Sequence, residues 1–145
     1  MFLTIKKIKM VIGFKKQFVP KILDGTKEHT IREDATNRWK AGRVMDMATG
    51  VRTKAYNKFT EQICISTQKF QIKWDIPFGE EYKGRLFKVF IDDRCMNNNF
   101  YLNNEPMLQV IARKDGFDTL EDFLDWFSED FTGKILHWTD LKYQL

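Results

Sequence analysis

The stretch FVPKILDGTKEHTIR, residues 18–32, says more about the fold of this chain than any other. It predicts a short helix over Phe18–Leu23, because Pro20 suits the first turn of a helix and Gly25 suits its C-terminal end. The residues His29–Arg32 that follow predict an extended segment. The stretch therefore describes a helix, a glycine turn and a strand in quick succession.

Lys27, Thr30 and Arg32 place three side chains with useful chemistry at this turn. A lysine that is partly withdrawn from water loses pKa and can act as a base or as an oxyanion donor. A threonine hydroxyl becomes a nucleophile when a neighbouring base takes its proton, and an arginine can hold a phosphate or carboxylate through two parallel hydrogen bonds. In a regular strand Lys27 and Thr30 would point to opposite faces, so they converge only if Lys27 still belongs to the turn after Gly25. The alternative is a solvated lysine beside a threonine that is favoured for its strand propensity.

Asp115 is a second candidate for chemistry. It lies at the C-terminal end of a helix predicted over Pro106–Lys114, directly before Gly116. The helix dipole disfavours a negative charge at this end and so favours the protonated carboxyl group, which could donate a proton. The alternative is a loop residue beside a glycine in the left-handed conformation.

Trp39 lies between Arg38 and Lys40, and this combination of a ring with basic side chains suits stacking on nucleic-acid bases. We therefore predict a stacking surface at Trp39. Phe14 and Phe18 are expected in the core.

The rest of the chain predicts more strands and one more helix. Apolar patterning indicates strands over Lys9–Phe14, Val44–Ala48, Leu86–Ile91 and Lys134–Trp138. The segment Ile63–Trp74 also looks like a strand, but its apolar residues change parity midway, which predicts a curved strand with a bulge at a barrel corner.

A helix over Thr119–Ser128 has Asp118 as its expected N-cap and Glu121 three residues later. Strands and three short helices without βαβ alternation predict the α+β class, as a small mixed β-barrel.

Composition predicts one domain over residues 1–145, since 43% hydrophobic residues supply a core without disulfide bonds. Cys64 and Cys95 are expected to be a reduced pair in a cytoplasmic protein. The first ten residues lack the apolar run of a signal peptide, and no segment approaches the length of a membrane span. The spacing of His and Cys residues predicts no metal site, and the nucleotide-binding glycine loops are missing, so we expect no cofactor.

Charge is distributed unevenly along the chain. Residues 1–60 hold 14 Lys and Arg against 5 Asp and Glu, whereas residues 61–145 hold 10 against 15. This asymmetry indicates either a basic face that meets an anion such as nucleic acid, or two halves that attract each other in the fold. The acidic residues of the last helix are expected on its solvent face.

The order of these features resembles the ASCH domain, a branch of the PUA-like β-barrel superfamily. The residues that carry the resemblance are the helix before Gly25, the pattern Gly25-x-Lys27-x-x-Thr30-x-Arg32, then Arg38-Trp39-Lys40-x-Gly42, Gly50-x-Arg52-Thr53-Lys54, and Asp115-Gly116-Phe117. The resemblance implies a barrel with a cleft that binds RNA, or a nucleotide or nucleoside, with Arg32, Trp39, Lys40, Arg52 and Lys54 as binding residues.

One bacterial branch of this family is similar in the same segment and hydrolyses N4-acetylcytidine to cytidine and acetate. The resemblance implies Lys27 as base, Thr30 as nucleophile and Asp115 as proton donor, although that branch has a glutamate in place of the aspartate. The sequence therefore leaves two hypotheses open: an RNA- or nucleotide-binding module and an N4-acylcytidine amidohydrolase. It leaves the oligomeric state open as well.

Overall fold

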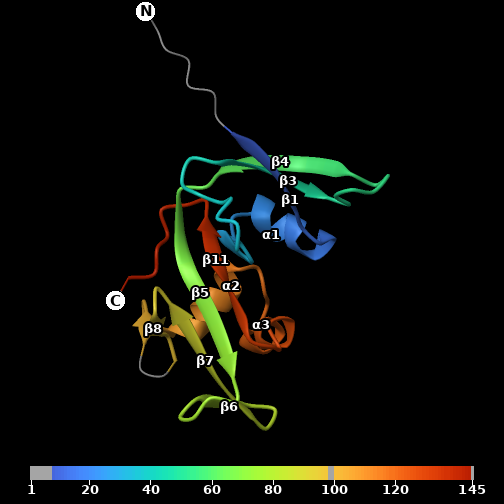
Figure 1. Ribbon diagram of the computed structural model, residues 1–145. Coiled ribbons are helices and arrows are strands. Elements are labelled where there is room, and N and C mark those ends of the chain that lie inside the picture. Colours follow the sequence, from blue (N-terminus) through green and yellow to red (C-terminus); the bar gives the residue numbers. More distant parts are fainter. Residues whose placement is uncertain (1–7, 98–99, 145) are drawn as a thin grey trace, which may run out of the picture.

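The structure, a computed structural model, describes residues 8–97 and 100–144. Over these residues the protein is α+β, as predicted, with three α-helices and strands in three sheets. Figure 1 shows the smaller three-stranded sheet at one end of the molecule, and β5, β7 and β6 extending toward the other end. The described strands do not close into a single barrel.

The smaller sheet has the order β1-β3-β4. Strand β1 (Lys9–Gly13) runs parallel to β3 (Val44–Thr49), and β4 (Asn57–Ile63) runs antiparallel to β3 with a register shift between Met47 and Ala48. Between β1 and β2 lie a 3-10 turn, η1 (Lys16–Phe18), and helix α1 (Val19–Leu23). The helix predicted over Phe18–Leu23 is confirmed as α1, with its first turn beginning one residue later.

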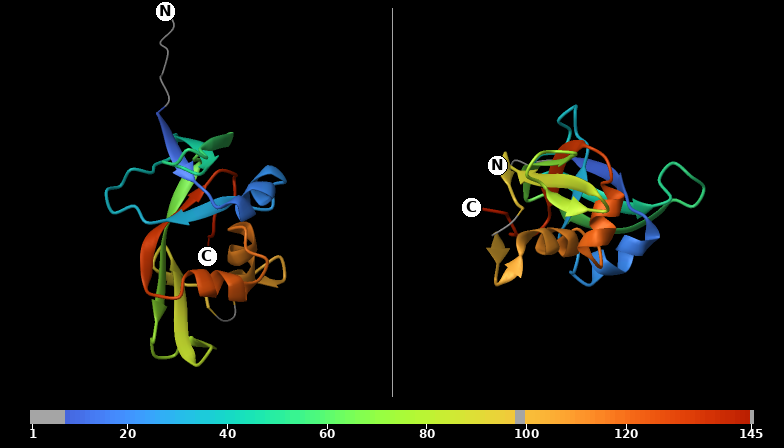
Figure 2. Two further views of the ribbon diagram at one scale, coloured as in Figure 1. Left: turned by 90° about the vertical axis from the view of Figure 1, so that its right-hand side faces the viewer. Right: turned by 90° about the horizontal axis from the view of Figure 1, so that it is seen from below.

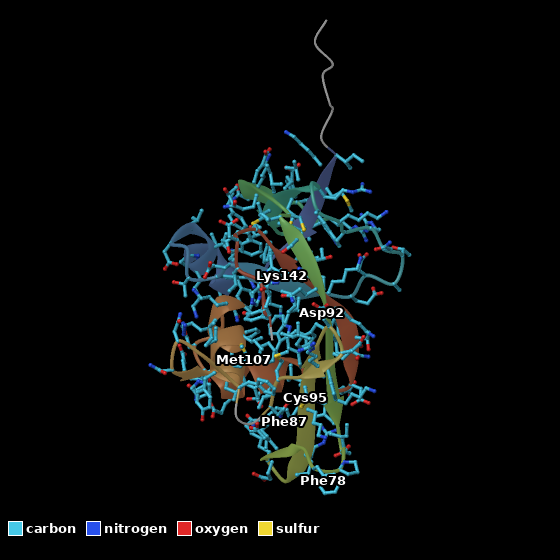
Figure 3. The ribbon with its side chains drawn as sticks, turned by 90° about the vertical axis from the view of Figure 1, so that its left-hand side faces the viewer. Phe78, Phe87, Asp92, Cys95, Met107 and Lys142 are labelled. Carbon is cyan, nitrogen blue, oxygen red and sulfur yellow. The ribbon has the colours of Figure 1, made fainter. Side chains whose placement is uncertain are left out.

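The larger sheet has the order β2-β11-β5-β7-β6, and β8 also pairs with β7. The bounds of its strands are β2 (His29–Arg32), β5 (Ser66–Trp74), β6 (Glu80–Tyr82), β7 (Arg85–Ile91), β8 (Arg94–Cys95) and β11 (Phe131–His137). A separate two-stranded ladder joins β9 (Tyr101–Leu102) to β10 (Glu105–Pro106). Figure 3 shows Phe78, 91% exposed, at the end of the molecule beside β6.

The prediction of one curved strand over Ile63–Trp74 is wrong. The chain leaves the smaller sheet after β4 and enters the larger sheet as β5, two residues later. At the crossing, Cys64 N donates to Arg43 O beside β3, whereas Ile65 N donates to His137 O at the end of β11. The change in apolar parity therefore arises because two strands of different sheets follow one another.

Helices α2 (Met107–Lys114) and α3 (Leu120–Trp126) lie together on one side of the larger sheet (Figure 2). The expected N-cap of α3 shifts by one residue: Thr119 Oγ1 accepts the Asp122 N–H at 3.1 Å, whereas Asp118 forms an ion pair with Lys21. The asparagine run Asn97–Asn99 predicts a loop, and this segment lies partly outside the described residues.

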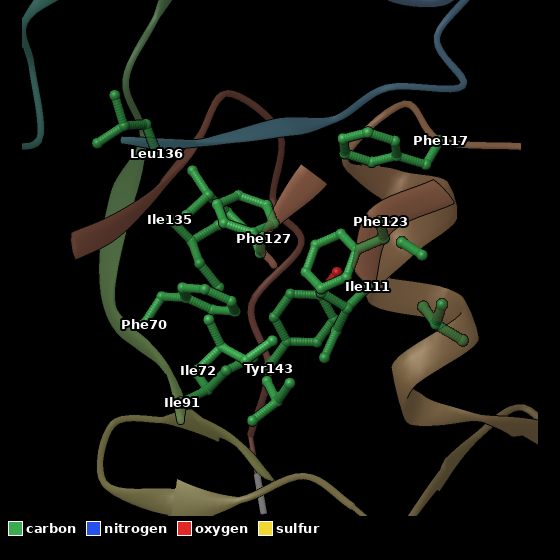
Figure 4. Close-up of a cluster of buried hydrophobic side chains, with 14 of the residues drawn as sticks. Phe70, Ile72, Ile91, Ile111, Phe117, Phe123, Phe127, Ile135, Leu136 and Tyr143 are labelled. Atoms are coloured by element: carbon green, nitrogen blue, oxygen red, sulfur yellow. The ribbon is translucent and has the colours of Figure 1, made fainter. Parts of the chain in front are cut away.

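The core lies between these helices and the sheet. Figure 4 shows phenylalanine rings from both sides meeting there, together with Tyr143 from the C-terminal segment. Phe70 of β5 lies with its ring centroid 6.1 Å from that of Phe123 and 5.6 Å from that of Phe127. Cys64 and Cys95 carry no disulfide bond. None of the helices in the described part of the chain is long and apolar enough to span a membrane.

Candidate functional site

The turn after α1 directs Lys27 into a cavity. Gly25 has a φ of 85°, Thr26 N donates to Asp24 Oδ1 at 2.8 Å, and Lys27 N donates to Lys21 O at 2.9 Å. Lys27 thus belongs to the turn and precedes β2, so strand alternation does not separate it from Thr30. The condition for their convergence is therefore met, and both residues line the same cavity.

The cavity has a volume of about 440 Å³, within the range of about 300–1,000 Å³ typical of small-molecule sites. Its lining combines polar and charged side chains with aromatic rings. The polar and charged side chains are Lys15, Lys27, Thr30, Arg32, Glu33 and Asp115, and the rings belong to Phe14, Phe18, Phe117, Trp126, Phe127 and Phe131. A planar ligand with hydrogen-bonding edges suits such a lining.

Lys27 is almost fully buried, with 2% of its surface exposed. Its Nζ donates to the backbone carbonyl of Asp115 and lies 3.4 Å from Asp115 Oδ1. The rings of Phe18, Phe14 and Trp138 surround it, with centroids at 5.0, 5.8 and 6.0 Å from Nζ. Burial lowers the pKa of Lys27 to about 8, although the negative charge of Asp115 opposes this change. In about a tenth of the molecules Lys27 is therefore neutral at pH 7 and able to accept a proton.

Gly116 leaves the space that the Lys27 side chain occupies. A Cβ at this position would lie 2.8 Å from Lys27 Cδ and 2.9 Å from Phe18 Cδ1, and the φ of Gly116 is 95°. Both observations favour glycine at this position.

Thr30 and Arg32 share one face of β2 and contact each other. Arg32 Nε donates to Thr30 Oγ1 at 3.1 Å, and Nη2 donates to the Gly13 carbonyl at 2.7 Å. The guanidinium carbon lies 4.7 Å from the centroid of the Phe14 ring. Because Thr30 Oγ1 accepts from Arg32, its own proton can be donated to a ligand or to a base.

Asp115 is the C-cap residue of α2 and is only 3% exposed. Its Oδ1 lies between Lys27 Nζ and His29 Nδ1, which is 3.1 Å away. The structure therefore brings Asp115 into one cavity with Lys27 and Thr30, the grouping that the family resemblance implied, and adds His29 as a neighbour.

The remaining predicted binding residues lie elsewhere. Trp39 is 6% exposed and packs in the core, so it does not offer an open ring for stacking. The reason is that the loop folds back: Asp34 accepts the Trp39 N–H, and Lys134 donates to the Trp39 carbonyl. Lys40, Arg52 and Lys54 are exposed and outside the lining of the cavity, which reaches only Gly50 and Val51 in that loop.

Trp126 is an exposed aromatic residue at the cavity that sequence reasoning missed. It is 45% exposed, and Lys15 Nζ lies 5.0 Å from the centroid of its ring. Trp126 thus combines an open ring with a cation, the arrangement expected at Trp39. Its signal in the sequence is a tryptophan at the margin of the apolar stripe of α3.

Some of the basic residues in the first part of the chain form ion pairs with acidic residues of the second part. Lys9 pairs with Glu61, Lys21 with Asp118 and Lys27 with Asp115, each joining the basic first part of the chain to the acidic second part. The acidic residues predicted on the solvent face of the last helix are exposed: Asp118, Glu121, Asp122, Asp125, Glu129 and Asp130.

His29 and His137, far apart in the sequence, are paired in register between β2 and β11, with ring centroids 5.2 Å apart. Within residues 8–97 and 100–144, no three His, Cys, Asp or Glu side chains are grouped so as to hold a metal ion.

Comparison with known proteins identifies no relative of this chain. No protein-family model matches the chain, and no curated protein or solved structure is significantly similar to it. The function must therefore be inferred from the chemistry of the cavity.

Proposed function

We propose that this protein is an ASCH-type, PUA-like domain that binds a nucleoside or a nucleotide of RNA in the cavity beside β2. The observation that carries this proposal is one cavity that combines aromatic walls with Lys27, Thr30 and Arg32. Rings stack on bases with little regard to sequence, while hydroxyl and guanidinium groups hydrogen-bond base edges and phosphates. Trp126 supplies a stacking ring, and Lys15 supplies a neighbouring cation, with its Nζ 5.0 Å from the centroid of that ring.

Calorimetric titration with cytidine monophosphate and with short single-stranded RNA tests this proposal. We expect Trp126→Ala to weaken binding by about 5- to 150-fold, corresponding to about 1–3 kcal/mol for a stacked base. Lys15→Ala should reduce affinity and the dependence of affinity on salt, whereas its matched control Lys40→Ala, an exposed lysine outside the cavity, should not. Equal effects of the two lysine variants, or the absence of binding, would contradict the proposal.

A second candidate function, amidohydrolysis of N4-acylated cytidine, is favoured by one observation. Lys27, with its pKa lowered to about 8, lies in the same cavity as the Thr30 hydroxyl. Lys27 would take the Thr30 proton and Thr30 Oγ1 would attack the acyl carbon. The C–N4 bond would break as that proton passes from Lys27 to the Asp115 carboxylate and from Asp115 to the leaving amine. Water would then hydrolyse the acyl-threonine ester to the carboxylic acid. Lys27 Nζ bonds to Asp115 and Thr30 Oγ1 to Arg32 in this structure, so Lys27 must turn toward Thr30 when substrate binds.

Incubation with N4-acetylcytidine, followed by chromatography for cytidine, tests the second candidate. We expect release by the wild type and by Thr30→Ser, and loss of release in Lys27→Met and Thr30→Val. Release that survives Lys27→Met would refute this mechanism. Binding without release would leave the binding module as the function.

A further inference from the structure

His29 lies behind the cavity and joins Asp115 to the C-terminal segment. Its ring is fully buried, with Nδ1 3.1 Å from Asp115 Oδ1 and Nε2 2.7 Å from the Tyr143 hydroxyl. A hydrogen-bond network of Lys27, Asp115, His29 and Tyr143 thus runs from the cavity into the core. None of the steps proposed above uses His29 or Tyr143.

Tyr143 is held in place by its backbone and by the residues before it. The buried side chain of Gln68 accepts the Tyr143 N–H at 2.9 Å and donates to the Tyr143 carbonyl at 2.7 Å. Thr139 anchors the same segment, because its hydroxyl donates to Glu28 Oε1 at 3.0 Å. The Tyr143 hydroxyl is therefore presented to His29 by a fixed segment.

The hydrogen bonds specify the tautomer of His29. A carboxylate only accepts hydrogen bonds, so Nδ1 carries the proton toward Asp115. Burial lowers the pKa of His29, so the ring is neutral at pH 7 and Nε2 is an acceptor. The Tyr143 hydroxyl then donates to Nε2, and its donation excludes a proton from that nitrogen.

We propose that His29 and Tyr143 are positioning residues, which together hold the Asp115 carboxylate beside Lys27, and that the C-terminal segment is thereby part of the site. The proposal rests on the proposed function only in taking the cavity as the binding site. If His29 carried its proton on Nε2, the lone pair of Nδ1 would face Asp115 Oδ1 and repel the carboxylate. The Nδ1–H tautomer instead keeps Asp115 oriented toward the lysine.

Several charged groups act on Lys27 from the elements around it. Asp115 at the end of α2 favours its charged form, whereas Arg32 of β2 and Lys21 of α1 disfavour it. Lys15 and Glu33 line the same cavity. On His29 the neighbours are Asp115, Lys27, Glu28, His137 and Tyr143. Because Asp115 is the acidic group nearest to Lys27, its orientation controls how readily Lys27 keeps its proton.

The first test needs no variant and no ligand. Nitrogen NMR of the 15N-histidine-labelled wild-type protein at pH 7 distinguishes the two tautomers. We expect His29 to show a protonated Nδ1 and an unprotonated Nε2. The opposite tautomer, or a charged imidazolium, would overturn the proposal, whatever the cavity binds.

The second test compares two amide variants of His29, each of which replaces one of the two ring nitrogens. The readout is NMR titration of the Lys27 side chain, assigned with Lys27→Met. His29→Asn places an amide donor near the position of Nδ1 and keeps the contact with Asp115, whereas His29→Gln reaches toward Tyr143 and loses it. Asp115→Asn, which removes the charge, should lower the pKa of Lys27 by about 1 to 3. We expect His29→Gln to lower it as well and His29→Asn to leave it near the wild-type value.

Equal Lys27 titrations in His29→Gln and the wild type, alongside a lowered pKa in Asp115→Asn, would refute the positioning role. If a His29 variant does not fold, Tyr143→Phe removes one oxygen atom from the array while keeping the ring in the core. We then expect a mixture of His29 tautomers, and an unchanged single tautomer would count against Tyr143. Both readouts come from the protein without ligand, so they stand apart from success or failure of the binding and turnover experiments.

Discussion

Lys27 carries its charge inside the protein, and this charge should make the stability of the fold depend on pH in the alkaline range. The pKa of Lys27 is about 8 in the folded protein, against 10.5 for an unperturbed lysine. Below pH 8 the lysine is charged in both states, and its burial reduces the free energy of unfolding by about 3 kcal/mol. Between pH 8 and 10.5 the folded protein releases this proton first, so the penalty disappears and stability rises with pH.

Urea unfolding, followed by tryptophan fluorescence from pH 7 to 10, measures this effect when the wild type is compared with Lys27→Met. Other titrating groups are common to both proteins and cancel in the difference. We expect the free energy of unfolding of the wild type to rise relative to that of Lys27→Met by about 2 to 3 kcal/mol over this range. Loss of the partner of Asp115 shifts one curve relative to the other by a constant amount. The difference between their slopes therefore reports the titration of Lys27.

Lys40→Met, at an exposed position, serves as the control and should run parallel to the wild type. Parallel curves for the wild type and Lys27→Met would refute the reasoning, because they would mean that Lys27 titrates at the same pH in the folded and unfolded chains.

Three further predictions concern stability and are measured by denaturant unfolding. Gly116→Ala should cost more than Gly84→Ala, which shares a positive φ but has no atom within 4 Å of the added Cβ; equal costs of about 1 kcal/mol would deny the contact with Lys27. Thr119→Ala should cost about 1 kcal/mol and Thr119→Ser much less, whereas a larger loss in Asp118→Ala would restore Asp118 as the cap. Burial lowers the pKa of His137 to about 3, so stability should fall as pH drops below 6.5, by about 2 kcal/mol at pH 5; a His137→Gln variant with the same acid dependence would contradict this.

The local elements of this protein could be predicted from the sequence because each depends on residues close together in the chain. Helix α1 begins near Pro20 and ends before Gly25, and β2 follows as expected. The apolar stripe of α2 is buried, and the strands around Val44 and Leu86 form where the pattern predicts them. The grouping of Lys27 and Thr30 was also within reach, since only the turn at Gly25 had to be recognised.

Contacts between distant segments could not be predicted in this way. The two histidines meet because β2 and β11 pair in the register His29–His137, and no spacing along the chain encodes that register. Tyr143 reaches His29 because Gln68 holds the C-terminal segment, an interaction across 75 residues. The exposure of Trp39 and Trp126 also depends on contacts between distant segments, since the fold buries Trp39 and leaves Trp126 exposed at the cavity.

The sequence by itself thus determined the α+β class, the three helices, the strands β1, β2, β3, β7 and β11, and the turn that carries Lys27, Thr30 and Arg32. Only the tertiary structure decided that the segment Ile63–Trp74 divides between two sheets, that the described strands leave the barrel unclosed, and that Asp115 and His29 lie behind the lysine. The physical reason is that patterns of polarity and turn residues act over a few positions, whereas strand pairing and the desolvation of Lys27 arise only when distant segments pack together.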